Sequence, residues 1–331
     1  MIAFLAFATS SQAATVTVGA RLPMDVVENV VIGCSESCVV TNPTAPDGAS
    51  DLSPVDGVIL RWRLYRGSAP SPEGPDPGYR LRVLTPFAGG YLAAGTSSLA
   101  VPTRFDAVET FSTYLPVRAG QLIALEALNH DSSLRFGFSK AATSVFLEPA
   151  IADGEDAPEQ PVWEDGYLFP FNADVLPPPR IYGVSPSGGS VGSSANVIVR
   201  GDNFAEVGSV IFGGQPVEFT VDSESQITAK APPGTQIGPV AVTVTTIAGR
   251  AEAAGGYRYD GCVVPKLKGK SLKAARNALR LSKCRLGDVR RRHGATARTG
   301  RVKRQGLPRG AVLPPDAPVE VALGLNPKRL P

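Results

Sequence analysis

The sequence predicts a mainly β, multidomain protein with two β-sandwich domains followed by a small α+β module. Its 331 residues exceed the usual size of a single domain. The 35 Gly and 30 Pro residues favour short strands joined by many turns over long helices. With 43% hydrophobic and 19% charged residues, the composition is that of ordered globular domains rather than of a disordered chain.

The N-terminal stretch is apolar and ends in small residues. Ser11 and Ala13 follow a hydrophobic run and provide the small side chains that a signal peptidase requires. These features predict a signal peptide over residues 1–13, truncated at its start because no Lys or Arg precedes Arg21. The alternative is a hydrophobic first strand. No other stretch approaches the roughly 20 apolar residues of a membrane helix, so we expect a secreted or cell-wall-associated chain without a transmembrane segment.

Residues 14–176 predict an antiparallel β-sandwich or jelly-roll-like domain of no recognised family. Apolar and basic residues alternate over 58–65 and 79–84, the period-two pattern of strands with one solvated face. Turn residues separate these strands from further short candidates at 113–117, 122–127 and 134–138. An acidic, proline-bearing stretch from 153 to 161 runs on to the prolines at 177–179 and predicts a stiff linker at the domain boundary.

Aromatic residues in this first domain suggest two alternatives. They form either a platform for a carbohydrate or part of the core, where most aromatic residues of β-sandwiches lie. The candidates are Trp62, Tyr65, Tyr79, Trp163 and Tyr167.

Glycines, prolines and β-branched residues follow one another in a characteristic order from 178 to 259. They are Pro179, Ile181, Pro186, Gly188, Gly189, Val197 to Val199, Gly201, Phe204, Val210 to Gly214, Ile227, Pro232, Pro233, Val240 to Val244 and Gly249. In this order they resemble the IPT/TIG family. The resemblance implies an immunoglobulin-like β-sandwich over 177–260 that acts as a spacer or an interaction surface. Independently, Gly213 and Gly214 lie between two β-like runs and predict a two-residue hairpin turn.

A second set of residues characterises the C-terminal segment. It comprises Val264, Pro265, Leu267, Gly269, Ser271, Ala275, Leu279, Leu286, Gly287, Gly300, Val302, Gln305, Pro308, Gly310 and Val319 to Leu323. These residues resemble the PASTA family over 261–324, with a tail at 325–331. The resemblance implies a small α+β module that recognises peptidoglycan fragments. Ser271 predicts a helix N-cap, because its hydroxyl can accept from the first turn, and Leu272, Ala275 and Leu279 then share one helix face.

Positive charge is concentrated in this module. Residues 261–331 contain 18 Lys and Arg against 3 Asp and Glu, whereas the preceding 260 residues contain 15 against 27. The candidate ligand-binding residues are a stripe on the predicted helix and a later arginine run: Lys273, Arg276, Arg280, Lys283, Arg290, Arg291 and Arg292. Guanidinium groups bind carboxylates and phosphates, which predicts an anionic partner, and the resemblance to PASTA implies that this partner is peptidoglycan or another anionic cell-wall polymer. Nucleic acid is disfavoured because the expected export keeps this surface outside the cytoplasm. The alternative is a solvated basic face that aids solubility.

The four cysteines fit an exported protein. Cys34 lies close to Cys38, and Cys262 and Cys284 flank the predicted helix, so we expect one disulfide within each of these two domains. Free buried thiols are an alternative. A zinc site is disfavoured because more than two hundred residues separate the two pairs and neither has a nearby histidine.

No catalytic constellation is evident, so we expect a non-enzymatic protein without a cofactor or metal site. Gly188 to Gly192 match the nucleophile-elbow pattern, but they precede a Val- and Ile-rich strand rather than a helix. His130 and His293 lie in different predicted domains. We therefore expect a bacterial cell-envelope protein whose basic module binds an anionic wall polymer and whose IPT/TIG segment is a spacer. The alternatives are a carbohydrate-binding or adhesion protein with specificity in the first domain, possible partners being a carbohydrate or a surface protein, and a purely structural spacer.

Overall fold

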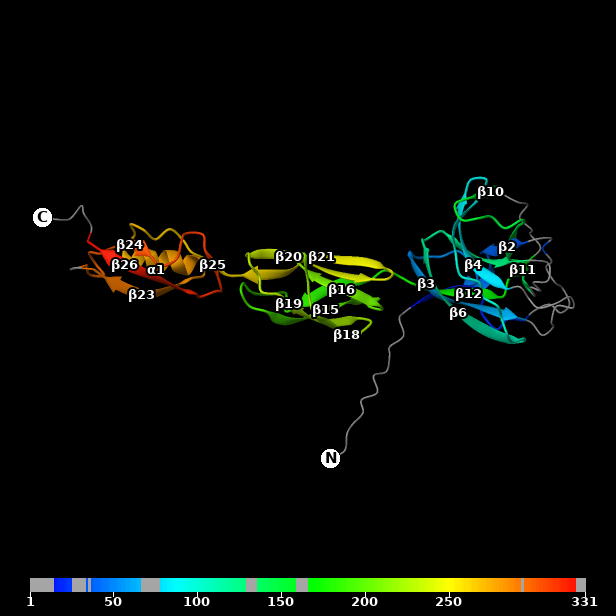
Figure 1. The fold of residues 1–331 in the computed structure, drawn as a ribbon, viewed down its shortest axis with the longest axis horizontal. Coiled ribbons are helices and arrows are strands. Elements are labelled where there is room, and N and C mark those ends of the chain that lie inside the picture. Colours follow the sequence, from blue (N-terminus) through cyan, green and yellow to red (C-terminus); the bar gives the residue numbers. More distant parts are fainter. Residues whose placement is uncertain are drawn as a thin grey trace, which may run out of the picture. The chain divides into compact units, whose positions relative to one another are not determined.

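The computed structural model describes residues 15–25, 34, 37–66, 78–128, 136–158, 166–292 and 295–325. These residues form many β-strands and one α-helix, which confirms the mainly β fold class (Figure 1). The expected signal peptide, Trp163, both histidines and all but the first residue of the expected tail lie outside the described residues. The chain divides into two compact units, the first comprising residues 1–178 with 247–249 and the second residues 179–246 with 250–331.

Two antiparallel sheets build the first unit. One has the order β1 (Val16–Gly19), β12 (Phe171–Leu176), β3 (Gly57–Arg66), β6 (Ala107–Val117). The other has the order β10 (Asp156–Pro158), β5 (Gly90–Thr96), β4 (Tyr79–Phe87), β7 (Leu122–Ala127), β2 (Cys38–Thr44), β9 (Thr143–Leu147), and β8 (Gly137–Phe138) pairs separately with β11 (Tyr167–Leu168). Side chains from both sheets, among them Trp62, Leu81 and Phe171, share one buried core. The first unit is therefore a β-sandwich.

The expected boundary linker is wrong in part. Asp156–Pro158 pairs with β5 as an edge strand, and β12 lies between β1 and β3 with all six residues buried. Asn172 and Asp174 give this strand a polar appearance in the sequence, but hydrogen bonds satisfy both side chains inside the sheet. Residues that follow the acidic stretch thus complete the sandwich.

The second unit begins with an immunoglobulin-like sandwich over residues 179–260. Its first sheet has the order β13 (Arg180–Ser185), β15 (Ala195–Asp202), β19 (Gln226–Ala231), β18 (Phe219–Ser223). Its second has the order β14 (Gly188–Ser190), β21 (Gly249–Asp260), β20 (Gly238–Thr246), β16 (Val207–Phe212), β17 (Gln215–Pro216). The predicted hairpin turn is present: Phe212 pairs with Gln215, and Gly213 and Gly214 have φ values of 56° and 87°.

The C-terminal module, which we define as residues 261–325, has α+β structure. The helix α1 (Leu272–Leu281) begins after Ser271, whose hydroxyl accepts from the Ala274 N–H as predicted. A three-stranded sheet has the order β23 (Arg285–Arg291), β26 (Pro318–Gly324), β24 (Arg301–Gln305), and β22 (Cys262–Val263) pairs with β25 (Val312–Leu313). Ala275 and Leu279 pack with Val319, Val321 and Leu323 in a core of their own.

Candidate functional site

The face of the β23–β26–β24 sheet that points away from α1, here called the outer face, is basic. Val319, Val321 and Leu323 are buried in the core with α1, so the alternating residues Glu320 and Ala322 lie on the outer face. Arg290 on β23 and Arg304 on β24 are both in register with Ala322. Residues in register share a face, so two guanidinium groups flank the small side chain of Ala322.

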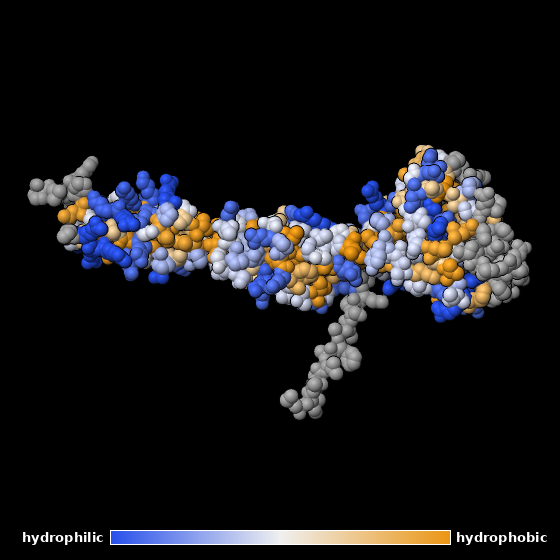
Figure 2. All heavy atoms as spheres, in the orientation of Figure 1, coloured by the Kyte–Doolittle hydropathy of each residue, from blue (hydrophilic) through white to orange (hydrophobic). Residues whose placement is uncertain are grey.

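These arginines border a shallow hollow of about 520 Å³, which we call the outer-face pocket. Its polar lining consists of Arg290, Arg292, Lys303, Arg304, Gln305 and Glu320. All four cations are exposed, and hydrophilic residues gather over this module in the space-filling view (Figure 2). The pocket thus presents several positive charges to solvent around a small apolar floor.

No carboxylate among the described residues forms an ion pair with the cations of the pocket. Within the part of the chain that the structure describes, Arg290, Arg292, Lys303 and Arg304 form no ion pair closer than 4.0 Å. Glu320 is the one acidic residue among those that line the pocket. Forked guanidinium groups in this state can bind a phosphate or carboxylate bidentately.

The residues predicted from the arginine run separate in the structure. Arg290 and Arg292 line the outer-face pocket, whereas Arg291 is in register with Leu323 and lies on the side of the sheet that faces α1. The sequence analysis missed Lys303 and Arg304, although they continue the strand that begins at the predicted Val302 position. Their proximity to Arg290 depends on pairing through β26, for which no local sequence pattern exists.

The predicted helical stripe is interrupted. Lys273, Arg276 and Arg280 are exposed on α1, but Lys283 lies beyond the end of the helix with φ of 51°. Its ammonium group is 3.1 Å from Asp260 Oδ1, and Arg280 Nη2 donates to Asn277 Oδ1 at 3.2 Å. The stripe is therefore shorter than predicted, and two of its members have partners within the chain.

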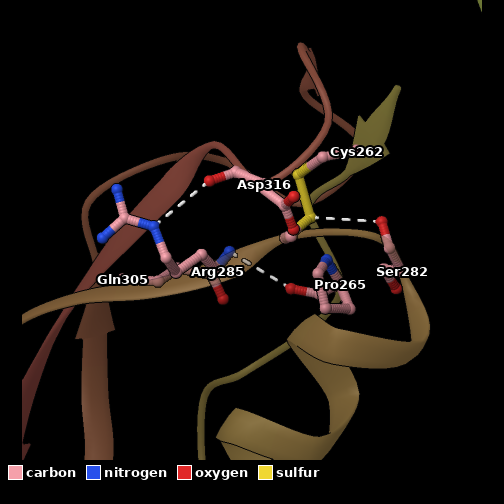
Figure 3. The surroundings of a disulfide bond; sticks show 7 residues. Cys262, Pro265, Ser282, Arg285, Gln305 and Asp316 are labelled. Carbon is pink, nitrogen blue, oxygen red and sulfur yellow. Dashed lines mark hydrogen bonds between the residues drawn. A yellow bond between two sulfur atoms is a disulfide. The ribbon is translucent and has the colours of Figure 1, made fainter. Parts of the chain in front are cut away.

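Disulfides join Cys34 with Cys38 and Cys262 with Cys284, as the sequence predicts, so these sulfurs are not zinc ligands. The second bond connects β22 with the residue that follows the α1 C-terminal turn (Figure 3). In the same region Arg285 Nε donates to the Asp316 carbonyl oxygen, and Gln305 Nε2 donates to the Pro265 carbonyl oxygen. These contacts fix both edges of the sheet that carries the pocket.

Of the two alternatives for the aromatic residues of the first domain, the described residues support the core. Trp62 and Tyr79 are buried in the sandwich core, where Trp62 packs on Phe111 at 4.8 Å between ring centroids. Tyr167 packs at the edge of the same core against Phe136, and Tyr65 donates to Asp106. These side chains therefore do not form an open stacking surface.

An arginine cluster in the first unit offers a useful contrast with the outer-face pocket. Asp174 on β12 is buried and accepts hydrogen bonds from Arg61 Nε at 2.5 Å and Arg63 Nη2 at 2.6 Å. Burial by itself raises the pKa of Asp174, but hydrogen bonds from Arg63, Arg61 and Thr17 outweigh it and lower the pKa below its ordinary value. We call this cluster the Asp174 ladder.

Similarity to known proteins identifies the middle of the chain. Residues 179–259 match the IPT/TIG domain family. This segment is an IPT/TIG domain. In it, the sequence that matches the nucleophile elbow forms β14, which pairs in parallel with β21 and is followed by β15 rather than by a helix. No curated protein matches the chain.

Three solved structures show distant similarity. The SGBP-B protein from a complex xyloglucan utilization locus in Bacteroides uniformis is 18% identical, covers 66% of this chain and 48% of its own, and has a TM-score of 0.23. An auxiliary nutrient binding protein from Bacteroides thetaiotaomicron is 18% identical, with coverages of 28% and 24% and a TM-score of 0.21. The plexin A4 extracellular region is 15% identical, with coverages of 78% and 17% and a TM-score of 0.25. The chain spans less than half of each of these proteins, and none of the similarities assigns a ligand to it.

The described residues contain neither a membrane-spanning helix nor a cluster of metal-binding side chains. Their one α-helix is too short to cross a membrane, and no longer apolar helix exists among them. Nor do three or more His, Cys, Asp or Glu side chains gather anywhere in these residues in a way that would hold a metal ion.

Proposed function

We propose that this protein is an extracellular, non-enzymatic adhesion protein whose C-terminal module binds an anionic polymer of the bacterial cell surface. In this proposal the module is of the PASTA type, the IPT/TIG domain is a spacer, and peptidoglycan is the first ligand to test. The observation that carries the proposal is the outer-face pocket, where Arg290 and Arg304 flank Ala322 without an internal counter-ion among the described residues.

The outer face supports binding better than the helix does. The exposed cations of α1, Lys273, Arg276 and Arg280, line neither hollow of the module, whereas the cations of the outer face surround one. A hollow allows several donors to converge on one anionic group, and hydrogen bonds to charged groups contribute about 1.5–3 kcal/mol each. The two disulfides fit an oxidising location outside the cytoplasm.

The test is retention of the full chain on insoluble peptidoglycan at about 0.15 M salt. We expect the double variant Arg290→Gln/Arg304→Gln to lose affinity on the order of 100-fold, because two charge-assisted contacts disappear. The matched control is Lys273→Gln/Arg276→Gln, which removes the same charge from α1 and should change affinity less than about threefold.

Three results would contradict the proposal. Failure of the wild-type chain to bind would exclude peptidoglycan, and equal losses in the two double variants would show that net charge alone drives binding. Unchanged retention of Arg290→Gln/Arg304→Gln would favour the alternative, in which the first unit binds a carbohydrate.

A further inference from the structure

A fourth backbone segment extends the sheet beyond the outer-face pocket. Residues 265–270 run along the free edge of β24: the Gly269 N–H donates to the Val302 carbonyl oxygen at 2.8 Å, and the Val302 N–H donates to that of Lys270 at 2.9 Å. The Gln305 side chain secures the same segment, because its Oε1 accepts from the Leu267 N–H at 2.9 Å (Figure 3 shows its contact with Pro265). The basic outer face therefore continues past β24.

This added segment carries further cations. Leu267 is buried in the module core, and its neighbours Lys266 and Lys268 are exposed. Both lysines line a second hollow of about 620 Å³, which we call the edge pocket, together with Arg309. The edge pocket and the outer-face pocket share four lining residues, Lys303, Arg304, Gln305 and Gly306. The two hollows are thus parts of one continuous basic surface.

We infer that this surface is a binding track for a linear polymer with repeated phosphate or carboxylate groups, which engages both pockets at once. The inference rests on the proposed function and specifies its ligand class. The track crosses four adjacent segments, β23, β26, β24 and residues 265–270. Because neighbouring segments of a sheet lie about 4.7 Å apart, the three intervals between them add up to a width of about 14 Å. A single anionic group occupies one pocket, whereas a polymer of this length contacts both. Once the polymer is bound at one pocket, its binding at the second is intramolecular, which raises the overall affinity.

The lining also defines what the track does not recognise. Among the described residues that line the two pockets none is aromatic, so the aromatic platform on which nucleobases and the flat faces of neutral sugars commonly stack is lacking there. The track recognises charge, because its lining contains seven cationic side chains and one carboxylate, that of Glu320. The cations are Lys266, Lys268, Arg290, Arg292, Lys303, Arg304 and Arg309. This composition favours an anionic glycan or polyol-phosphate polymer over a neutral glycan or a nucleic acid.

The experiment measures the affinity of the full chain for tripolyphosphate, for a long polyphosphate, and for short and long oligogalacturonates. We expect the long polymers to bind at least about tenfold more tightly than the short ones. Lys266→Gln/Lys268→Gln should remove this advantage, because it weakens the long polymers about tenfold more than the short ones, and it should lower the slope of log affinity against log salt for the long polymers by about 1.4. Lys273→Gln/Arg276→Gln is the control and should retain the advantage. Comparison of the phosphate and carboxylate series identifies which anionic group the track prefers.

The results separate the two proposals. If the long and short polymers bind equally, and Arg290→Gln/Arg304→Gln weakens both, the pocket binds anions but the track is wrong. The track is also wrong if Lys266→Gln/Lys268→Gln weakens short and long polymers alike. Tighter binding of a single-stranded oligonucleotide of equal charge would overturn the ligand class. Absence of binding to any of these polymers would contradict the proposed function itself.

Discussion

The first unit and the C-terminal module both display arginines on the face of a sheet, but only the first unit neutralises them. In the Asp174 ladder, a buried carboxylate on β12 holds Arg61 and Arg63. In the outer-face pocket, the position between Arg290 and Arg304 is Ala322, which has no charge. The residue on the strand beside the arginines therefore decides whether they stabilise the fold or remain available to a ligand.

The unneutralised cations of the outer face lower the stability of the C-terminal module. Residues 261–331 have a formal charge of +15, and like charges on a small domain repel one another. The disulfide Cys262–Cys284, with a sequence separation of 22, constrains the unfolded chain and stabilises the module by about 3 kcal/mol. In the first unit, Asp174 balances part of the charge of Arg61 and Arg63 locally.

Removing the carboxylate of the Asp174 ladder should have the largest effect, a loss of stability of the first unit. Asp174→Ala removes the shared acceptor of Arg61 and Arg63, which are partly buried, and loss of a hydrogen bond to a charged group costs about 1.5–3 kcal/mol. We expect the urea unfolding midpoint of the first unit to fall accordingly. Asp156→Ala is the control, since Asp156 is an exposed acid in the same unit and should change stability by less than about 0.5 kcal/mol. Equal effects of the two variants would show that the ladder is not structural.

The converse change adds a carboxylate to the outer face of the C-terminal module. Ala322→Asp places a carboxylate between Arg290 and Arg304, where it both occupies the guanidinium groups and repels an anionic ligand. We expect affinity for the long polyphosphate to fall about tenfold or more, while the circular dichroism spectrum stays unchanged. Ala322→Asn has nearly the same size without the charge and serves as the control. If Asn weakens binding as much as Asp does, the effect is steric and the comparison between the two sheets does not hold.

Lowering the pH should have a smaller effect on the stability that the Asp174 ladder contributes. The pKa of Asp174 is lowered in the folded state, so the stability that its carboxylate contributes is complete above the unfolded value of about 3.9. This stability is lost as the pH falls through the folded pKa. Burial raises the pKa of Asp51 despite hydrogen bonds from Asn42 and Thr41, so its contribution has the opposite sign and is lost as pH rises.

The comparison of wild type with Asp174→Asn isolates the effect of the ladder, because Asp51 is present in both. We expect the difference in their unfolding free energy to shrink as the pH falls from 5 into the range below the folded pKa of Asp174. Urea titrations at several pH values would measure it. A difference that stays constant with pH would mean that Asp174 has an ordinary pKa in the folded protein.

Local structure was predictable from the sequence wherever neighbouring residues determine it. The Ser271 cap, the buried helix positions Ala275 and Leu279, and the Gly213-Gly214 turn all depend on contacts within a few residues. The disulfides were also predictable, since each pair lies within one domain of the expected chain division. These features require no knowledge of how distant segments meet.

The candidate site was only partly predictable for the opposite reason. Arg290 and Arg304 meet through β26, which pairs in parallel with β23 and antiparallel with β24, and such long-range pairing leaves no periodic pattern in the sequence. The helix stripe was conspicuous because its residues recur at helical spacing, yet Lys283 lies outside the helix. Similarly, β12 resembled a linker because its buried Asp174 depends on Arg61 and Arg63, which lie far away in the chain.

The smallest effect on ligand affinity should come from Glu320, the one acidic residue among those that line the outer-face pocket. Glu320 lies on the outer face of β26, two residues before Ala322, and repels any anion that enters the outer-face pocket. Glu320→Gln should therefore tighten binding of the long polyphosphate by about threefold, in keeping with the modest strength of exposed charge interactions. Asp316→Asn removes the same charge from a loop outside both pockets and should leave the affinity nearly unchanged. Equal gains in both variants would show that the module attracts polymers through its net charge alone, whereas a gain confined to Glu320→Gln would show that the ligand lies on the sheet face.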